Sequence, residues 1–184
     1  MEEKLPKEVV IRLFENQNEI ADLGISSISV FEEMAKDIRE KSNFECTFYE
    51  SAEDVSDPRE LNSEKKNLMV FDDLLLEKQI TCESYYVRGR HSNVDCFYLA
   101  QNYFKLPRQT ISDNTNFICL FPQDLKNLNH IFDHHVGSDM TKEEFRQLRK
   151  TAWEKQHEFV IFDLSSKKNN GKYRSGLNEF YIPN

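Results

Sequence analysis

The sequence holds only five glycines in 184 residues, and none of them belongs to a G-x-x-x-x-G-K-[ST] motif. That motif folds into a loop whose backbone amides and lysine hold nucleotide phosphates, so the sequence does not encode this way of binding a nucleotide. The four cysteines, Cys46, Cys82, Cys96 and Cys119, form no C-x-x-C pair. Their spacing argues against a zinc ribbon or a disulfide framework, and we expect reduced thiols.

Long apolar runs are also missing. None approaches the roughly 18 residues that cross a bilayer, and the first ten residues, MEEKLPKEVV, lack the apolar core of a signal peptide. We therefore expect a soluble, intracellular protein with no membrane partner. With 39% hydrophobic and 12% aromatic residues the chain should fold, and its length favours one α/β domain with a single core.

Positive charge is in the minority, because 24 bases stand against 32 acids and give a net charge of −8. This balance argues against a simple nucleic-acid coat protein. The charges are uneven, however: residues 1–80 hold 20 acids and 10 bases, whereas residues 142–174 hold 5 acids and 9 bases. The basic segment is either an ordinary solvated face or a surface that meets phosphates.

The apolar patterns predict an α/β fold with a mostly parallel sheet flanked by helices. Four short apolar runs, near 68–72, 94–100, 117–121 and 159–163, are separated by helical segments, which is typical of parallel strands joined by right-handed crossovers. The expected organisation is an N-terminal helical segment (1–43), an α/β core (44–164) and a polar, mobile C-terminal tail (165–184). The further elements expected are helices at 6–20, 29–41, 83–91, 124–135 and 141–155, a strand at 44–50 and a surface connection at 51–66.

The run NLMVFDDLLLEK, residues 67–78, ends an apolar strand with Asp72 and Asp73. This is the pattern of a Walker B element, in which the first carboxylate holds nucleotide-bound magnesium and the second polarises the attacking water. The alternative is that the pair caps the helix that follows. Gln101 follows the next predicted strand, where an amide can orient a water or sense a terminal phosphate. It could equally satisfy loop backbone.

Two further motifs carry candidate side chains. YYVRGRHSN holds Arg88 and Arg90, which we expect near the carboxyl ends of strands, where ligands of parallel sheets gather. Their guanidinium groups can bind phosphate oxygens, so Arg88 or Arg90 could act on a nucleotide held by a neighbouring subunit. Surface ion pairs are the rival explanation. NHIFDHH holds His130, Asp133, His134 and His135. His130 and His134 share a helix face as in two-histidine zinc sites, but a third ligand and a glutamate base are not evident.

Taken together, VFDD, RGRH-N, YLAQNYF-LP and the R-x5-N spacing of Arg108 to Asn114 resemble the genome-packaging ATPases of large DNA viruses and of virus-like Maverick (Polinton) transposons. These enzymes belong to the FtsK–HerA group of P-loop ATPases. The resemblance covers roughly residues 44–164. It implies ATP and Mg²⁺ as cofactors, a ring-shaped homo-oligomer, and double-stranded DNA and capsid or portal proteins as partners, at a virus assembly site in the nucleus or the cytoplasm.

The same resemblance implies roles for particular residues. Asp72 is the magnesium carboxylate, Asp73 the water-activating acid and Gln101 the sensor amide, while Arg88 or Arg90 acts in trans. Because the family carries the phosphate loop and this sequence does not, the expected fold is an incomplete P-loop NTPase core that is inactive alone. We expect either the C-terminal part of a longer ATPase or a degenerate copy. The alternative function is a non-catalytic interaction or DNA-binding module derived from such an ATPase.

Overall fold

A computed structural model describes residues 9–15, 44–49, 54–72, 74, 78–107, 109–154 and 158–183. The chain forms two compact units. Unit 1 contains residues 1–101 and 106–114, and unit 2 contains residues 102–105 and 115–184. The mixed α/β fold that the sequence predicts is confirmed. The helix expected at 29–41, together with Asp73 and Arg108, lies outside the described residues.

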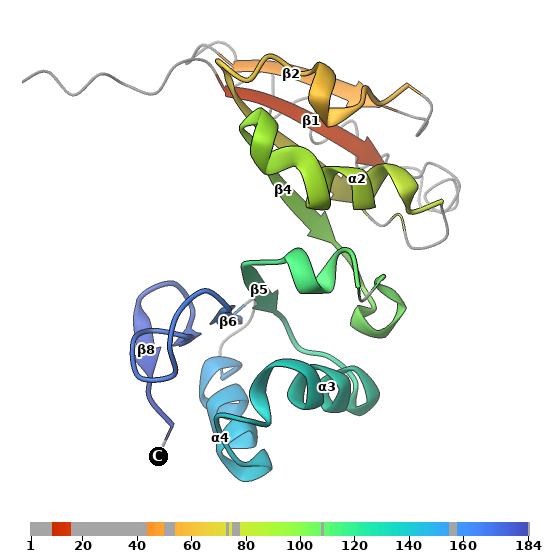
Figure 1. The fold of residues 1–184 in the computed structure, drawn as a ribbon. Helices are drawn as coiled ribbons and strands as arrows, with labels where there is room; N and C mark the ends of the chain where they lie inside the picture. The colour runs from red at the N-terminus through yellow and green to blue at the C-terminus, as the bar shows by residue number, and fades with distance from the viewer. Residues whose placement is uncertain are drawn as a thin grey trace, which may run out of the picture. The chain divides into compact units, whose positions relative to one another are not determined.

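Unit 1 is built on a parallel four-stranded sheet with the order β2-β1-β3-β4 (Figure 1). Its strands are β1 (Val9–Glu15), β2 (Phe44–Tyr49), β3 (Lys66–Asp72) and β4 (Val94–Leu99). The strands expected at 44–50, 68–72 and 94–100 are therefore confirmed. All three pairings, β1 with β2, β1 with β3 and β3 with β4, are parallel.

The helix predicted at 6–20 is wrong over the described residues, because Val9–Glu15 is the strand β1. The sequence VVIRLFE begins with three β-branched residues, which favour extended backbone. Its apolar positions fit a helix face as well as a strand buried on both faces, and periodicity alone cannot separate the two. Pairing with β2 and β3 on either side decides for the strand.

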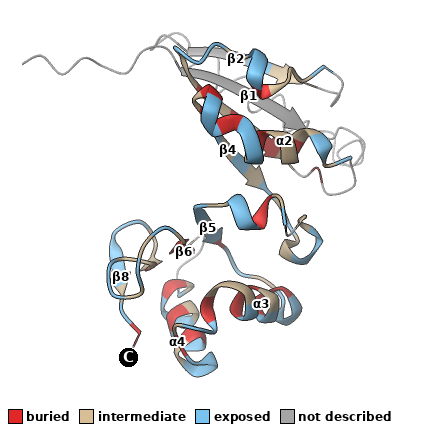
Figure 2. Cartoon of the chain, in the orientation of Figure 1, coloured by how far each residue is buried: buried red, intermediate tan, exposed pale blue. Residues whose placement is uncertain are grey.

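One face of the first sheet is covered by α2 (Ile80–Arg88). Alternate residues of β3 and β4 point toward this helix, and the buried residues of α2 appear in red in Figure 2. The aromatic ring of Phe71 packs edge-on against that of Tyr85, with 5.6 Å between ring centroids. The core cluster consists of Met69, Phe71, Leu74, Cys82, Tyr85, Val94 and Ile111. Two short 3₁₀ helices, η2 (Pro58–Glu60) and η3 (Gly89–Ser92), complete the connections on this side.

Unit 2 contains a second, antiparallel sheet with the order β5-β6-β7-β8. Its strands are β5 (Phe117–Leu120), β6 (Val160–Asp163), β7 (Tyr173–Ser175) and β8 (Glu179–Tyr181). The expectation that the runs near 117–121 and 159–163 join the parallel sheet is therefore wrong. The expectation of a mobile C-terminal tail is also wrong, because β7 and β8 continue the second sheet from β6.

Helices α3 (Leu125–Ile131) and α4 (Lys142–Ala152) pack on this second sheet through a core of aliphatic and aromatic side chains. The five residues Phe132–Val136 after α3 form a π-helix, η6. Thr141 and Glu144 close a capping box at the start of α4, which fixes where that helix begins. Two more 3₁₀ helices, η4 (Tyr103–Lys105) and η5 (Ser112–Asn114), lie in units 2 and 1 respectively. None of the helices in the described ranges is long and apolar enough to span a membrane.

Candidate active site

Asp72 and Gln101 lie at the same edge of the parallel sheet. Asp72 is the last residue of β3 and is opposite Leu99, the last residue of β4. Gln101 follows Leu99 by two residues and is exposed. Since adjacent strands are about 4.8 Å apart, a carboxylate and an amide that follow neighbouring strands lie at the same carboxyl edge of the sheet.

This edge is also the topological switch point of the sheet. The chain passes from β1 to β2 on one side and then places β3 and β4 on the other side of β1. Ligands of open α/β sheets bind outside the carboxyl ends of strands where the strand order reverses in this way. The reversal here falls between β1 and β3, whose last paired residues are Glu15 and Asp72. Asp72 therefore occupies the position at which the topology alone places a ligand.

Gln79 makes two hydrogen bonds that hold the connection leaving this edge in place. This residue was not identified in the sequence analysis. It is the N-cap residue of α2, and its side-chain amide donates to the backbone carbonyl of Leu74. Its Oε1 accepts a hydrogen bond of 3.0 Å from the Tyr98 hydroxyl on β4. Leu74 is fully buried just after the acidic pair. The connection after Asp72 is thereby tied to the neighbouring strand that leads to Gln101.

The sequence reading placed Arg88 and Arg90 near the carboxyl ends of strands, and this placement is wrong. Arg88 ends α2 and Arg90 lies in η3, directly before β4 begins at Val94. A Cβ built on Gly89 would lie 3.3 Å from the Cβ of Val94, which confirms how close this turn is to the start of β4. Because β4 has six residues, the two edges of the sheet are about 17 Å apart at a rise of about 3.3 Å per residue. Both arginines belong to the amino edge.

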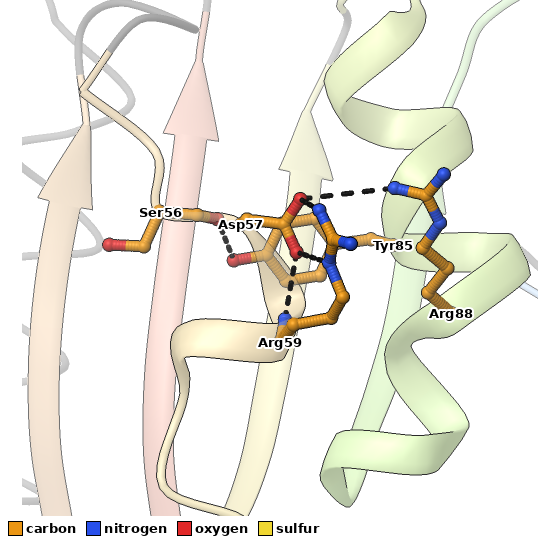
Figure 3. A network of polar contacts seen from close by, with 5 residues as sticks. All are labelled: Ser56, Asp57, Arg59, Tyr85 and Arg88. Atoms are coloured by element: carbon orange, nitrogen blue, oxygen red, sulfur yellow. Dashed lines mark hydrogen bonds and ion pairs between the residues drawn. The ribbon is translucent and has the colours of Figure 1, made fainter.

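At the amino edge, the carboxylate of Asp57 lies between two guanidinium groups (Figure 3). Arg59 donates to it twice, from Nε to Oδ1 at 2.8 Å and from a terminal nitrogen to Oδ2 at 2.9 Å. A terminal nitrogen of Arg88 is 3.9 Å from the same Oδ2. The hydrogen bonds from the side chain and backbone of Arg59 lower the pKa of Asp57 to about 2. Nearby, the Tyr85 hydroxyl donates to the carbonyl oxygen of Ser56 at 2.8 Å, so this connection is fastened to α2.

The histidine motif does not form a metal site in the described part of the chain, where no group of three potential ligands converges. Its rings instead contact the aromatic residues of η4. The Tyr103 hydroxyl is 2.5 Å from Nε2 of His135, and the ring of His130 lies against that of Phe104 with 4.4 Å between centroids. The motif also crosses from α3 into the π-helix, so the i, i+4 geometry of a regular helix does not hold through it.

Acidic partners neutralise several bases of the segment 142–174. Arg146 pairs with Glu143 at 2.7 Å, and Lys172 pairs with Asp139. Arg174 is 3.1 Å from Asp163, a buried carboxylate that also accepts from Ser165 and Ser166. These pairs leave the segment less able to bind phosphates than its sequence charge suggests.

The residues at the carboxyl edge suit one half of a nucleotide site. An aspartate carboxylate at a strand end is a hard oxygen donor of the kind that Mg²⁺ prefers. The stretch that follows β1 in the sequence, NQNEIADLG, has a single glycine and no lysine, so the sequence offers no phosphate loop beside the switch point. Asp72 is thus compatible with the magnesium side of such a site, and the sequence carries no G-x-x-x-x-G-K-[ST] motif for its phosphate side.

No protein-family model and no curated protein matches the sequence. Solved structures do share its fold. The genome-packaging NTPase B204 from Sulfolobus turreted icosahedral virus 2, in complex with AMP, has a TM-score of 0.52 at 13% identity over 85% of this chain and 78% of that chain. The DNA-packaging ATPase B204 from Sulfolobus turreted icosahedral virus has a TM-score of 0.51 at 13% identity over 86% and 92% of the two chains. Identity this low relates the folds only.

Proposed function

We propose that this chain is a portion of a DNA-packaging ATPase of the FtsK–HerA group, from a virus or a virus-like element. The observation that carries the proposal is the position of Asp72 and Gln101 at the same carboxyl edge, with Asp72 at the switch point of the sheet. The fold that the chain shares with B204, described as a DNA-packaging ATPase, supports it. The work of such an enzyme is ATP-driven translocation of double-stranded DNA into a capsid.

The two halves of the acidic pair have different tasks in this proposal. Asp72 contributes a carboxylate toward the Mg²⁺ of bound ATP, and Asp73 polarises the attacking water. Gln101, one strand away, orients that water and responds to the terminal phosphate. Bound Mg²⁺ supplies neutralisation of the phosphate charge. Gln79 and Tyr98 keep the connection after Asp72 in place beside β4.

Arg88 or Arg90 acts on a nucleotide held by another subunit. Their place at the amino edge separates them from Asp72 of the same chain, which is compatible with action in trans. This role requires a homo-oligomer, in which double-stranded DNA and a capsid or portal protein are the partners. Asp57 holds Arg88 only at 3.9 Å, whereas it holds Arg59 by two short hydrogen bonds, so Arg88 is the arginine more easily released to a phosphate.

The 184-residue chain alone should not hydrolyse ATP above background. A phosphate loop supplies most of the binding contacts to a nucleotide, and carboxylates that act on metal and water do not replace them. Inserting a G-x-x-x-x-G-K-[ST] loop directly after β1, the strand that pairs with β3 up to Asp72, should give an extended protein with restored turnover, measured as phosphate release.

In the extended protein, Asp73→Asn should lower kcat at least a hundredfold and change ATP affinity little, because the carboxylate acts on water. Asp113→Asn, the same substitution at an exposed acid of unit 1 outside the proposed site, is the matched control. The proposal would be overturned if the 184-residue chain hydrolysed ATP unaided and if its Asp72→Asn and Asp73→Asn variants kept the full rate. Absence of turnover together with salt-dependent DNA binding by the chain would instead favour a non-catalytic module.

A further inference from the structure

Helix α4 of unit 2 separates its bases from its acids. Four bases and the single tryptophan of the chain recur at the i, i+4, i+7, i+8, i+11 spacing, which places them along one side of the helix: Lys142, Arg146, Arg149, Lys150 and Trp153. The acids Glu143 and Glu144 fall outside this side. We call the four bases the basic row. It spans about 12 Å, because eight helical residues rise by about 1.5 Å each.

Arg149 is held in the basic row by two aromatic rings. Its guanidinium carbon lies 4.8 Å from the centroid of the Phe145 ring, one turn earlier, and 5.4 Å from that of the Trp153 ring, one turn later. Its Nε is buried and has no hydrogen-bond partner in the described part of the chain. Burial and the positive charge of Arg146 lower the pKa of Arg149. Because stacking already orients this guanidinium, an oxyanion that binds it costs little side-chain entropy.

The basic row is not neutralised by the protein itself. Lys142, Arg149 and Lys150 form no ion pair with any acid among the described residues. Arg146 pairs with Glu143, but both side chains are 70% exposed, and a phosphate can replace the carboxylate of such a weak surface pair. The remaining ion pairs of the basic segment involve bases outside α4. The row therefore keeps its positive charge although its neighbours lose theirs.

The charges of the chain are also divided between the two units. Unit 2 holds 11 bases and 9 acids, whereas unit 1 holds 13 bases and 23 acids. The negative total of the chain is thus a property of unit 1. Positive charge is available on unit 2, and on α4 it is concentrated in one row, which is the arrangement that attracts a polyanion.

We infer that the basic row of α4 binds the phosphate backbone of duplex DNA. A duplex carries one negative charge per about 1.7 Å of its axis, so a row of about 12 Å faces several phosphates at once. A lone carboxylate would occupy only one of the four bases. The choice of DNA rests on the proposed function, whereas the choice of a phosphate backbone rests on the row.

The aromatic residues beside the row favour a duplex over a single strand. Proteins that bind single strands stack the bases on exposed aromatic rings. Phe145 is only 3% exposed. Trp153 packs against the core of unit 2, and its Nε1 donates to the carbonyl oxygen of Leu120 at 3.3 Å. Both rings therefore serve to hold Arg149 and are not free to stack on bases.

The test is a titration of a short, labelled DNA duplex with the 184-residue chain, followed by fluorescence anisotropy between about 50 and 200 mM salt. The logarithm of the binding constant should fall with the logarithm of the salt concentration with a slope of about −3 to −4, because each neutralised phosphate contributes about −0.9. Arg149→Gln and Lys150→Gln should each reduce the slope by about 1 and weaken binding about five- to tenfold near 0.1 M salt. The emission of Trp153, which lies against Arg149, should change with the same midpoint.

Lys167→Gln is the matched control, because Lys167 is an exposed base of unit 2 outside α4. It should keep the affinity and the salt slope of the wild type. Arg149→Lys keeps the charge and should retain the slope. Lys150→Gln changes an exposed side chain, so its result does not depend on the folding of the Arg149 variants. A single strand of the same length and polyglutamate should both bind more weakly than the duplex.

The basic row would be overturned if the chain did not bind the duplex at about 50 mM salt, or if Lys150→Gln, Arg149→Gln and Lys167→Gln weakened binding equally. Polyglutamate or a single strand that bound as tightly as the duplex would overturn the assignment to a duplex backbone.

The result is independent of catalysis, because the chain tested has no inserted phosphate loop. An extended protein without turnover would contradict the proposed hydrolysis and leave the basic row as it is. Loss of duplex binding would contradict the row and leave the site at Asp72 as it is. Duplex binding together with turnover of the extended protein supports both proposals, and duplex binding without that turnover supports the row on a non-catalytic module.

Discussion

At the scale of single residues, Asp57 shows how one carboxylate organises the amino edge of the first sheet. It accepts hydrogen bonds from the backbone and side chain of Arg59 as the N-cap of η2, and it attracts Arg88 from the end of α2. These contacts favour the charged form, which is why the pKa of Asp57 falls to about 2. The side chain is near solvent, so its contribution to stability is modest and screened by salt.

The lowered pKa predicts a pH dependence of stability. Because the folded pKa lies below the ordinary value of 3.8, the stabilisation by Asp57 is present above about pH 4 and is lost as the pH falls toward 2. Asp57→Asn should therefore be less stable than wild type at pH 7, and the difference should shrink between pH 4 and pH 2. Urea midpoints measured across this range test the prediction.

The control for Asp57→Asn is Asp113→Asn, which also removes one negative charge from unit 1. Asp113 is exposed. A stability difference between Asp57→Asn and wild type that stays constant from pH 7 to pH 2 would contradict the prediction, because it would mean that the charge on Asp57 does not contribute.

At the scale of elements, the positions of the strands in the sequence were predicted more reliably than the way in which the strands pair with one another. The runs at β3 and β4 were recognised because apolar residues end at polar ones. The antiparallel pairing of β5 was missed because its apolar residues do not mark one buried face: Phe117 is 55% exposed, whereas Leu120 is buried. β1 was read as a helix for a related reason, since a short apolar run fits either structure.

The candidate site was predicted in part for reasons of the same kind. Asp72 and Gln101 follow strands directly, and parallel neighbours bring such ends together. Arg88 and Arg90 precede a strand, and the crossover geometry of a helix that returns to the amino edge could have placed them correctly from sequence. The hydrogen bond between Tyr103 and His135 joins residues 32 apart in the sequence, and no local sequence pattern predicts such a contact.

The hairpin of β7 and β8 depends on two glycines with left-handed backbone. Gly171 has φ +84°, and a Cβ built on it would lie 2.9 Å from Cε1 of Phe180. Gly176 has φ +61°, but its built Cβ meets only a carboxylate oxygen of Glu158 at 3.4 Å. An alanine at either position is strained by the backbone, at a cost of about 1–2 kcal/mol. Only at Gly171 must a neighbouring ring also move.

Gly171→Ala should therefore lower the free energy of unfolding more than Gly176→Ala does. The difference between the two variants should be about 1 kcal/mol, which is the cost of displacing a side chain moderately from its preferred rotamer. Chemical denaturation followed by tryptophan fluorescence reports on unit 2, where the single tryptophan, Trp153, lies beside the core. Equal effects of the two substitutions would show that the Phe180 ring moves away from Gly171 without cost.

At the scale of the whole molecule, each unit exposes strand edges. In the described part of unit 1, β4 is an edge strand, and Phe97 and Leu99 on its face away from α2 are 56% and 42% exposed. Sheets of parallel strands are ordinarily covered on both faces, and an open edge with apolar side chains promotes pairing with another chain.

The isolated chain should consequently self-associate, and β4 should carry the association. Sedimentation velocity at increasing concentration should show species larger than the monomer, and Phe97→Lys should shift the population toward monomer, because a charge on an edge strand opposes pairing. Ile80→Lys is the matched control: Ile80 is 75% exposed in the same unit, but it lies on α2 rather than on the edge strand. If both lysine variants reduce association equally, the change in net charge is responsible and not the edge of β4.

If the wild-type chain remains a single monodisperse monomer at high concentration, the exposed edge of β4 does not drive assembly. The homo-oligomer required for Arg88 to act in trans would then have to form through another surface.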